Sequence, residues 1–417
     1  MSAALEFLYR VLALLVLALA IRVVVDVWLE IPYSILLILV GVGISILPID
    51  VGLWLSHDVI MSLVLPLILF NGAIELNRRV LRENIVVPLV LVVVGIPLAV
   101  ALLGAATAAV FGLPVLIALL LAGIVVPTDP VAVLSLFEEI DAPERLSVII
   151  DSESLFNDGV AVVIVNVLLV LIAERPTPTG GSEIATTVVI DLIVVGVGGF
   201  LIGAVLGYTA TQFIRRVPER MAILLSTVLV AYGSYVLATS VVGVSGILAT
   251  VGAGLFIETT ASEGIEIDPD ILEFVRDTWE GGAFLLSTLV YVLIGAQVPI
   301  DSLVRRLEYI LVAAVLVLLV RAVVVYSLVG TMNAIATTKT PGSYQHMLVW
   351  GGLHTVVPIA LTLGLPAGLP RREFIQAVVF GVAITGALVQ GLLMPTVLRV
   401  TGIRERASRV GALDKTK

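Results

Sequence analysis

The chain has 417 residues, of which 59% are apolar and only 13% charged, and its formal net charge is −9. A soluble domain carries about 25% charged residues, so this composition indicates an integral membrane protein. An acidic chain lacks the basic face that nucleic-acid binding requires. The absence of cysteine excludes disulfides and thiolate metal sites. Because the three histidines are not spaced as zinc ligands, we expect no catalytic zinc and no cofactor.

Apolar segments long enough to cross a bilayer, which takes about 20 residues, recur along the whole chain. They predict an all-α polytopic protein with about thirteen transmembrane helices in a single domain, 1–398. The predicted spans are 7–29, 31–49, 54–76, 85–110, 113–137, 147–172, 186–214, 221–241, 244–258, 279–298, 309–332, 344–366 and 374–398. An acidic loop is predicted at 258–277 and a short cytoplasmic tail at 399–417.

The first span and the charges of the loops indicate how the chain crosses the membrane. Arg10 before an apolar run is also typical of a signal peptide, but the apolar pattern continues to Trp28, which favours a retained helix. Lys and Arg concentrate in the alternate loops that share a side with the C-terminus. Because positive charge marks the cytoplasmic side, we expect the N-terminus outside and the C-terminus in the cytoplasm. The expected location is the plasma membrane.

The seventh span contains Gly199, Gly203 and Gly207 at four-residue spacing. Small residues on one helix face let two helices approach closely. The stripe therefore indicates either a dimer contact or, as we favour, tight packing inside one bundle.

The fifth span is interrupted by the sequence Pro127-Thr128-Asp129-Pro130. Each proline lacks an N–H and clashes with the preceding turn, so a regular helix is not expected there. Freed carbonyls are tolerated at membrane depth only inside protein or along a water-filled cavity. Together with a hydroxyl and a carboxylate, they offer oxygen ligands for a hard cation. The alternative is a kinked helix with Asp129 near a loop.

The sixth span begins with a polar run in which Glu153 and Asn157, and likewise Ser154 and Asp158, stand four residues apart. Pairs at this spacing share one face of a helix. A cytoplasmic helix start would explain the first acids of the run. It would not explain Asp158, which an almost wholly apolar stretch follows. Ionisable groups inside a membrane are functional candidates by default.

The twelfth span carries a second proline-interrupted polar segment, 351–358. Matching interruptions in two halves of a chain indicate an inverted-repeat transporter site, so spans four to six and eleven to thirteen are predicted to be the paired units. His354, within this segment, is either a neighbour of a cation site or a packed polar residue. Arg321 lies in the middle of the eleventh span and stays protonated, so we expect it to pair with a carboxylate, and Glu153 is the predicted partner.

At these residues the sequence resembles the NhaP-like sodium/proton antiporters of the monovalent cation:proton antiporter family. The Asn157-Asp158 pair in its context is the most specific part of this resemblance, which covers nearly the whole chain. The stretches that carry it are Thr128–Pro130, Glu153–Gly159, Leu293–Gln297, Gly351–Leu353 and Pro358–Leu361.

The resemblance implies an inverted-repeat fold with two crossed, unwound helices. It implies a six-helix ion-transport core at approximately 85–172 and 309–398, and dimer or scaffold helices at approximately 1–76 and 186–298, in a homodimer. Asp158 would carry the ion and the proton. Asp129, Ser154 and Thr128 would complete a Na⁺ site, Asn157 would support it, and Glu153 with Arg321 would form a structural ion pair.

Two positions depart from the family pattern. Asn71 follows Phe70 where members often carry a glutamate, and His354 follows Gly-Gly-Leu where many carry an arginine. Glu75, four residues after Asn71, is a candidate substitute for the missing acid. Both changes affect the expected ion preference and pH profile.

The predicted function is exchange of a monovalent cation, Na⁺ or Li⁺, for protons, in sodium transport and pH homeostasis. The mechanism is alternating access with cation and proton competing for Asp158, and the resemblance implies electroneutral exchange. A K⁺/H⁺ antiporter on the same scaffold is the alternative. An intramembrane protease is disfavoured because no Gly-x-Gly-Asp motif surrounds Asp129 or Asp158, and an ion channel would move cations without protons.

Overall fold

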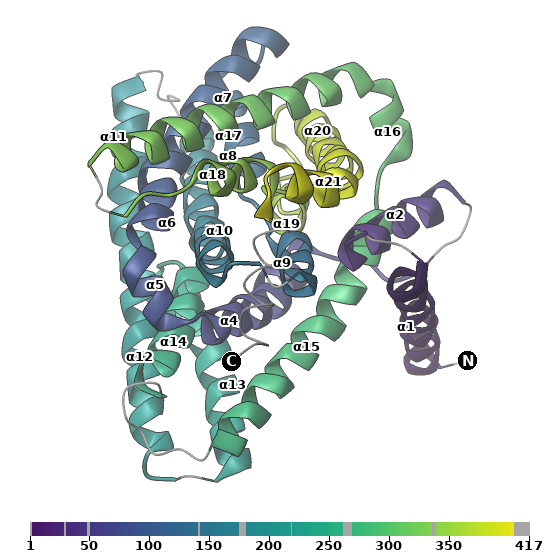
Figure 1. The fold of residues 1–417 in the computed structure, drawn as a ribbon. Coiled ribbons are helices and arrows are strands. Elements are labelled where there is room, and N and C mark those ends of the chain that lie inside the picture. Colours follow the sequence, from purple (N-terminus) through teal and green to yellow (C-terminus); the bar gives the residue numbers. More distant parts are fainter. Residues whose placement is uncertain are drawn as a thin grey trace. The chain divides into compact units, whose positions relative to one another are not determined.

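The computed structural model describes residues 2–28, 31–47, 51–140, 142–174, 181–217, 219–261, 269–335 and 338–403. Within these residues all regular elements are helices, and the one extended pairing is an isolated bridge between Asp129 and Leu353. Figure 1 shows these helices as ribbons, coloured along the sequence from purple at the N-terminus to yellow at the C-terminus. The predicted all-α class is therefore confirmed.

Several apolar helices contain a short π-helical stretch, labelled η, so that one span is made of two or three elements. The elements are α1 (Ala3–Trp28), α2 (Tyr33–Ile46), α3 (His57–Val59), η1 (Ile60–Val64), α4 (Leu65–Glu75), α5 (Arg78–Asn84), α6 (Val86–Val90), η2 (Leu91–Gly95), α7 (Ile96–Phe111), α8 (Val115–Val125), α9 (Val131–Glu139), α10 (Glu144–Ala173), α11 (Gly181–Asp191), η3 (Leu192–Val197), α12 (Gly198–Ile214), α13 (Arg220–Val236), η4 (Leu237–Val242), α14 (Gly246–Ala261), α15 (Pro269–Ala296), α16 (Ile300–Arg305), α17 (Leu307–Ile335), α18 (Gly342–Trp350), α19 (Val356–Leu363), α20 (Arg372–Thr385), η5 (Gly386–Gly391) and α21 (Leu392–Val400).

Nine helical segments of the described residues are long and apolar enough to cross a membrane, and α2, α8 and the first part of α14 are shorter apolar helices. With the interrupted pair α18 and α19, they occupy the places of the predicted spans. The protein is thus a multi-pass membrane protein.

One boundary differs clearly from the prediction. The tenth span was expected to begin at 279, after an acidic loop, but α15 already begins at Pro269. Its first turns carry Asp270, Glu273 and Arg276, and such charges conceal a helix from a search for apolar runs. Residues 262–268 of the predicted loop and 404–417 of the predicted tail lie outside the described residues.

The chain divides into two compact units, each described by itself below. Unit 1 comprises Met1–Ser56, Val86–Ile150 and Thr288–Lys417, and unit 2 comprises His57–Ile85 and Asp151–Ser287. The predicted division into a transport core and a scaffold stays a prediction.

Unit 1 is built around α17, which packs against α7, α18 and α20. One apolar core of this unit gathers buried side chains from the regions of α9, α10, α17, α18 and α21, among them Phe137, Ile149, Val325 and Met347. Close contact between α2 and α15 depends on two glycines. A Cβ at Gly41 would clash with the Val292 carbonyl, and a Cβ at Gly295 would clash with the Ile38 carbonyl.

Unit 2 packs α14 between α4, α12 and α13. The ring of Phe70 lies against Trp279, with centroids 4.5 Å apart, and the Trp279 indole donates a 3.0 Å hydrogen bond to Thr227. The glycine stripe of α12 lies directly on α14. Side chains at Gly199 and Gly203 would strike the carbonyls of Ser245 and Ala249. The stripe therefore packs inside the bundle, and the dimer-contact interpretation of these glycines is wrong.

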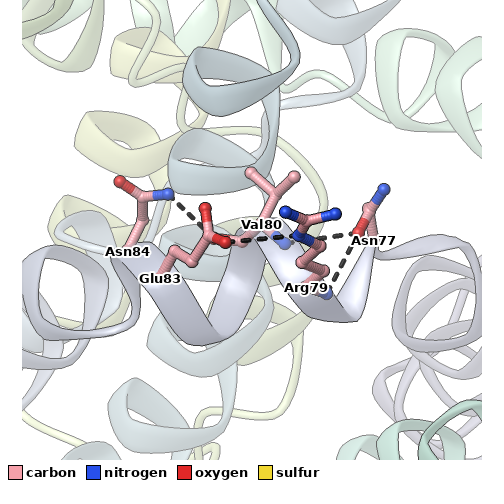
Figure 2. Close-up of polar contacts among 5 residues, drawn as sticks. All are labelled: Asn77, Arg79, Val80, Glu83 and Asn84. Atoms are coloured by element: carbon pink, nitrogen blue, oxygen red, sulfur yellow. Dashed lines mark hydrogen bonds and ion pairs between the residues drawn. The ribbon is translucent and has the colours of Figure 1, made fainter. Parts of the chain in front are cut away.

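Two short loops of unit 2 start their helices with side-chain caps. Figure 2 shows Asn77 accepting hydrogen bonds from the amides of Arg79 and Val80 at the start of α5. Glu219 caps α13 in the same way through the amides of Met221 and Ala222, and these bonds lower the pKa of its carboxyl group. Caps of this kind satisfy the first amides of a helix and fix the residue at which it begins.

The α12–α14 contact predicts that alanine is tolerated at one glycine of unit 2 and not at another. Gly203→Ala places a methyl group on the α14 backbone and should destabilise the protein by about 1–3 kcal/mol, as overpacking does. Gly233→Ala, on α13, meets open space and should be neutral or slightly stabilising, since alanine favours helix. Thermal unfolding in detergent measures both. Equal melting temperatures for the two variants would contradict this contact.

Candidate cation-binding site

Two interrupted helices cross in unit 1. The first break separates α8, which ends at Val125, from α9, which begins at Val131. The second separates α18, which ends at Trp350, from α19, which begins at Val356. The amide of Asp129 donates a 2.6 Å hydrogen bond to the Leu353 carbonyl, so each break satisfies a backbone group of the other. The predicted pair of crossed, unwound helices is confirmed.

Glycine makes this crossing possible. A Cβ at Gly352 would lie 3.0 Å from the Thr128 side chain and 3.4 Å from the Arg321 guanidinium. A Cβ at Gly351 would lie 3.1 Å from the Val133 side chain of α9. The Gly-Gly pair thus lets one unwound segment lie against the other.

Asp129 lies at the crossing with three hydrogen bonds to its carboxylate. Oδ1 accepts from the Val131 amide at 3.1 Å, in the first turn of α9. Oδ2 accepts from the Tyr291 hydroxyl at 3.0 Å and from the Thr355 hydroxyl. These bonds hold the carboxylate between the start of α9 and the second break.

His354 is buried and spans the two breaks. Its Nδ1 lies 2.9 Å from the Pro127 carbonyl. Because a carbonyl oxygen only accepts, Nδ1 carries the proton of this bond. His354 is therefore a packed polar residue that satisfies a carbonyl left free by the break, and its role as a neighbour of a cation site stays a prediction.

The carbonyls at the end of α18 are satisfied by side chains from other helices. The Arg321 Nε donates to the Leu348 carbonyl at 3.1 Å. Gln390, in η5, donates to the Trp350 carbonyl, and the Trp350 indole donates back to the Gln390 carbonyl, both at 3.0 Å. A helix end inside a membrane needs such partners because lipid offers none.

The polar stripe of α10 lies in unit 2. Glu153, Ser154, Asn157 and Asp158 are all buried, with Glu153 1% and Asp158 9% exposed. The Asn157 amide donates to Glu153 at 3.5 Å, which confirms that residues four apart share one face. Carboxyl, amide and hydroxyl groups are thus gathered inside an otherwise apolar helix.

Asn71 is also buried in unit 2, on α4. Its amide nitrogen donates to Glu75 at 2.7 Å, so the acid that we considered as a substitute holds Asn71 in place. The carbonyl oxygen of Asn71 accepts no hydrogen bond from the described residues. Next to it, a Cβ on Gly72 would contact Leu155 of α10 at 3.4 Å, which shows that α4 runs close to the polar stripe.

The predicted ligands therefore occur in two groups. Thr128 and Asp129 belong to unit 1, and Ser154 and Asp158 belong to unit 2. Arg321 and Glu153 are divided in the same way. The joint cation site and the Glu153–Arg321 ion pair stay predictions.

Sequence reasoning missed Tyr291, Thr355 and Gln390 as site residues. Thr355 directly follows His354 in the second break, and Tyr291 stands two residues before the Leu293–Gln297 stretch. A hydroxyl beside an expected break was the available signal. Nothing in the sequence indicated that α15 would reach the crossing.

Two broken helices crossing inside a polytopic helical protein are typical of secondary transporters, which bind ions where unwound backbone lines the site. A profile of the family described as sodium/hydrogen exchanger, transmembrane, matches residues 11–400. The Na⁺/H⁺ antiporter ApNhaP of Aphanothece halophytica is 34% identical over 388 residues, which cover 91% of this chain and 72% of that protein. The Na⁺/H⁺ antiporter NhaP of Pseudomonas aeruginosa is 31% identical over 350 residues, covering 82% and 81%.

The fold agrees with this relationship. The sodium proton antiporter MjNhaP1 from Methanocaldococcus jannaschii superposes with a TM-score of 0.73 at 21% identity, covering 99% of this chain and 98% of that one. The chain therefore belongs to the sodium/hydrogen exchanger family of secondary transporters and is not an enzyme.

The bond between His354 and Pro127 can be tested by removing the imidazole. His354→Phe leaves the Pro127 carbonyl buried without this donor, which should cost about 1–3 kcal/mol of stability. His346→Phe is the matched control, because His346 lies at an exposed contact with Tyr326. The measurement is thermal unfolding in detergent. A His354→Phe protein as stable as the control would show that the bond does not hold the two breaks together.

Proposed function

We propose that this protein exchanges Na⁺ or Li⁺ for protons across the cell membrane by alternating access. The observation that carries the proposal is the crossing of the two interrupted helices with Asp129 in it, in a chain that belongs to the sodium/hydrogen exchanger family. The relatives named above are Na⁺/H⁺ antiporters, and the same activity is proposed for this chain.

The cation site of this proposal consists of oxygen ligands from two stretches of the sequence. Asp129 and Thr128 supply oxygens beside unwound backbone, and Ser154 and Asp158 supply oxygens from the buried stripe of α10. Asn157 supports the stripe through Glu153. Asn71 adds a buried carbonyl oxygen that accepts no hydrogen bond from the described residues.

Exchange follows from competition at Asp158. Burial favours the neutral form of a carboxylate, whereas a bound cation favours the ionised form. One pocket then holds a proton or a cation, but not both. If only the occupied site crosses the membrane, each cation that moves one way requires a proton to move the other way.

Electroneutral exchange is part of the proposal. The residue beside Asp158 is the neutral Asn157, so this pair contributes one titrating group. One proton is then exchanged for one monovalent cation. Further parts of the proposal are a homodimer and the orientation with the N-terminus outside, which the distribution of Lys and Arg supports.

The decisive experiment is reconstitution in liposomes with a pH-sensitive dye inside. A pH gradient is imposed, and Na⁺, Li⁺ and K⁺ are added in turn, with and without a clamped membrane potential. Dissipation of the gradient by Na⁺ and Li⁺ that is independent of the clamp supports the proposal. A response to K⁺ alone would assign K⁺/H⁺ exchange, and cation flux without proton movement would indicate a channel.

Asp158→Asn should abolish cation-dependent proton movement in this assay, because the amide can carry neither the proton nor the compensating charge. The matched control is Asp301→Asn, on the exposed side of α16, which should exchange as the unmodified protein does. Size-exclusion profiles check that both variants fold. Exchange retained by a folded Asp158→Asn protein would overturn the assignment of the carrier.

Glu153→Gln should act mainly on stability. If Glu153 pairs with Arg321, removal of the carboxylate leaves the half-buried guanidinium without its counter-charge, at a cost of up to about 3–5 kcal/mol. The double variant Glu153→Gln with Arg321→Gln should lose less stability than the sum of the two single variants. Glu308→Gln, at an exposed position of α17, controls for loss of a surface charge. Additive losses of melting temperature would contradict the pair.

A further inference from the structure

We propose that Tyr291 and Thr355 form a hydroxyl clamp on Asp129 that sets the affinity and the ion selectivity of the cation site. The clamp holds the carboxylate in one orientation and adds two neutral oxygens next to it. This inference rests on the proposed function and names residues that determine the substrate preference of the same site.

The hydrogen bonds of Asp129 leave it little freedom. An ionised carboxylate offers about four lone-pair positions. The Val131 amide uses one on Oδ1, and the hydroxyls of Tyr291 and Thr355 use two on Oδ2. One lone pair, on Oδ1, is left for a cation, so the two carboxylate oxygens cannot both bind the same ion. A cation at Asp129 therefore needs further oxygens close to it.

Thr355 is diverted from its ordinary role to make this contact. It stands at the N-cap position of α19, where a threonine hydroxyl commonly accepts from an amide of its own helix. No such bond forms, and the hydroxyl donates to Asp129 instead. The residue is 4% exposed, so this hydroxyl lies inside the protein.

Tyr291 reaches Asp129 from a third element. Its side chain is 3% exposed, and a buried phenol needs a hydrogen-bond partner. Its place along α15 is fixed one turn further on, where Gly295 lies against the backbone of α2. The clamp therefore joins α15 to both broken helices rather than adding one more bond between the breaks.

The chemistry of the hydroxyls suits a monovalent cation. A hydroxyl that donates its proton to Asp129 keeps its oxygen lone pairs, so it can bind a cation without breaking the hydrogen bond. Two such oxygens beside Asp129 add neutral ligands to the site without adding charge. The number, field strength and spacing of oxygens are what separate Na⁺ from K⁺, and a clamped carboxylate keeps that spacing constant.

The test compares variants that remove only the hydroxyls. Tyr291→Phe and Thr355→Val preserve shape, and Thr355→Ser restores the hydroxyl. Matched controls are Tyr326→Phe, whose hydroxyl contacts the exposed His346, and Thr385→Val, whose hydroxyl donates to the Gly381 carbonyl of its own helix. Each variant is reconstituted, and exchange rates are measured over a range of Na⁺, Li⁺ and K⁺ concentrations to give KM and kcat for each cation.

Tyr291→Phe and Thr355→Val should each raise the KM for Na⁺ about tenfold, as expected for loss of one bond to a charged group, with kcat changed less than threefold. They should also narrow the difference in KM between Na⁺ and K⁺. Thr355→Ser and both controls should behave as the unmodified protein.

Two results would overturn the clamp while leaving the proposed function intact. One is an unchanged KM for Na⁺ in both hydroxyl variants. The other is a fall in kcat at constant KM, which is the result of a merely structural bond. Absence of exchange in the unmodified protein would instead refute the proposed function itself.

Discussion

The structure depends on how backbone groups are satisfied where two helices are broken inside an apolar protein. A broken helix leaves amides and carbonyls that lipid cannot satisfy. In unit 1 the breaks satisfy one another through the bond from Asp129 to Leu353. Side chains bind further carbonyls beside the breaks, as His354 does for Pro127 and Arg321 for Leu348. The polar residues of this region therefore have a structural role before they have a role in transport.

Close helix contact is the second requirement. Glycine appears where backbones meet, at Gly41 and Gly295 between α2 and α15 and along α12 against α14, and Gly352 in the crossing lies against the Thr128 and Arg321 side chains. At each of these positions a Cβ would strike or crowd the neighbouring segment, so a larger residue would force the two segments apart. The motif stretches Leu293–Gln297 and Gly351–Leu353 thus owe part of their character to packing. These two stretches carry no charged side chain, and their close packing positions the neighbouring Tyr291 and Thr355 at Asp129.

Asp129 and Asp158 differ in their surroundings, and this difference suggests different roles. Asp129 is held by an amide and two hydroxyls at the start of α9, which suits a ligand kept in one orientation. Asp158 lies on a buried stripe beside a neutral asparagine, which suits the group that exchanges a proton for a cation. The hydroxyl clamp and the proposed carrier would then divide the work, with selectivity at one aspartate and coupling at the other.

The sequence by itself determined the membrane class, the places of the spans, the two breaks and the polar stripe of α10, because apolar run length, proline and four-residue spacing are local properties. It missed the early start of α15, whose charged first turns resemble a loop, and it left the role of His354 and of the α12 glycines open. Only the tertiary structure decided these points, since they depend on which helices meet. The partners of Asp129 are the clearest case, because Tyr291 stands more than 160 residues away and no local pattern records a hydrogen bond between distant segments.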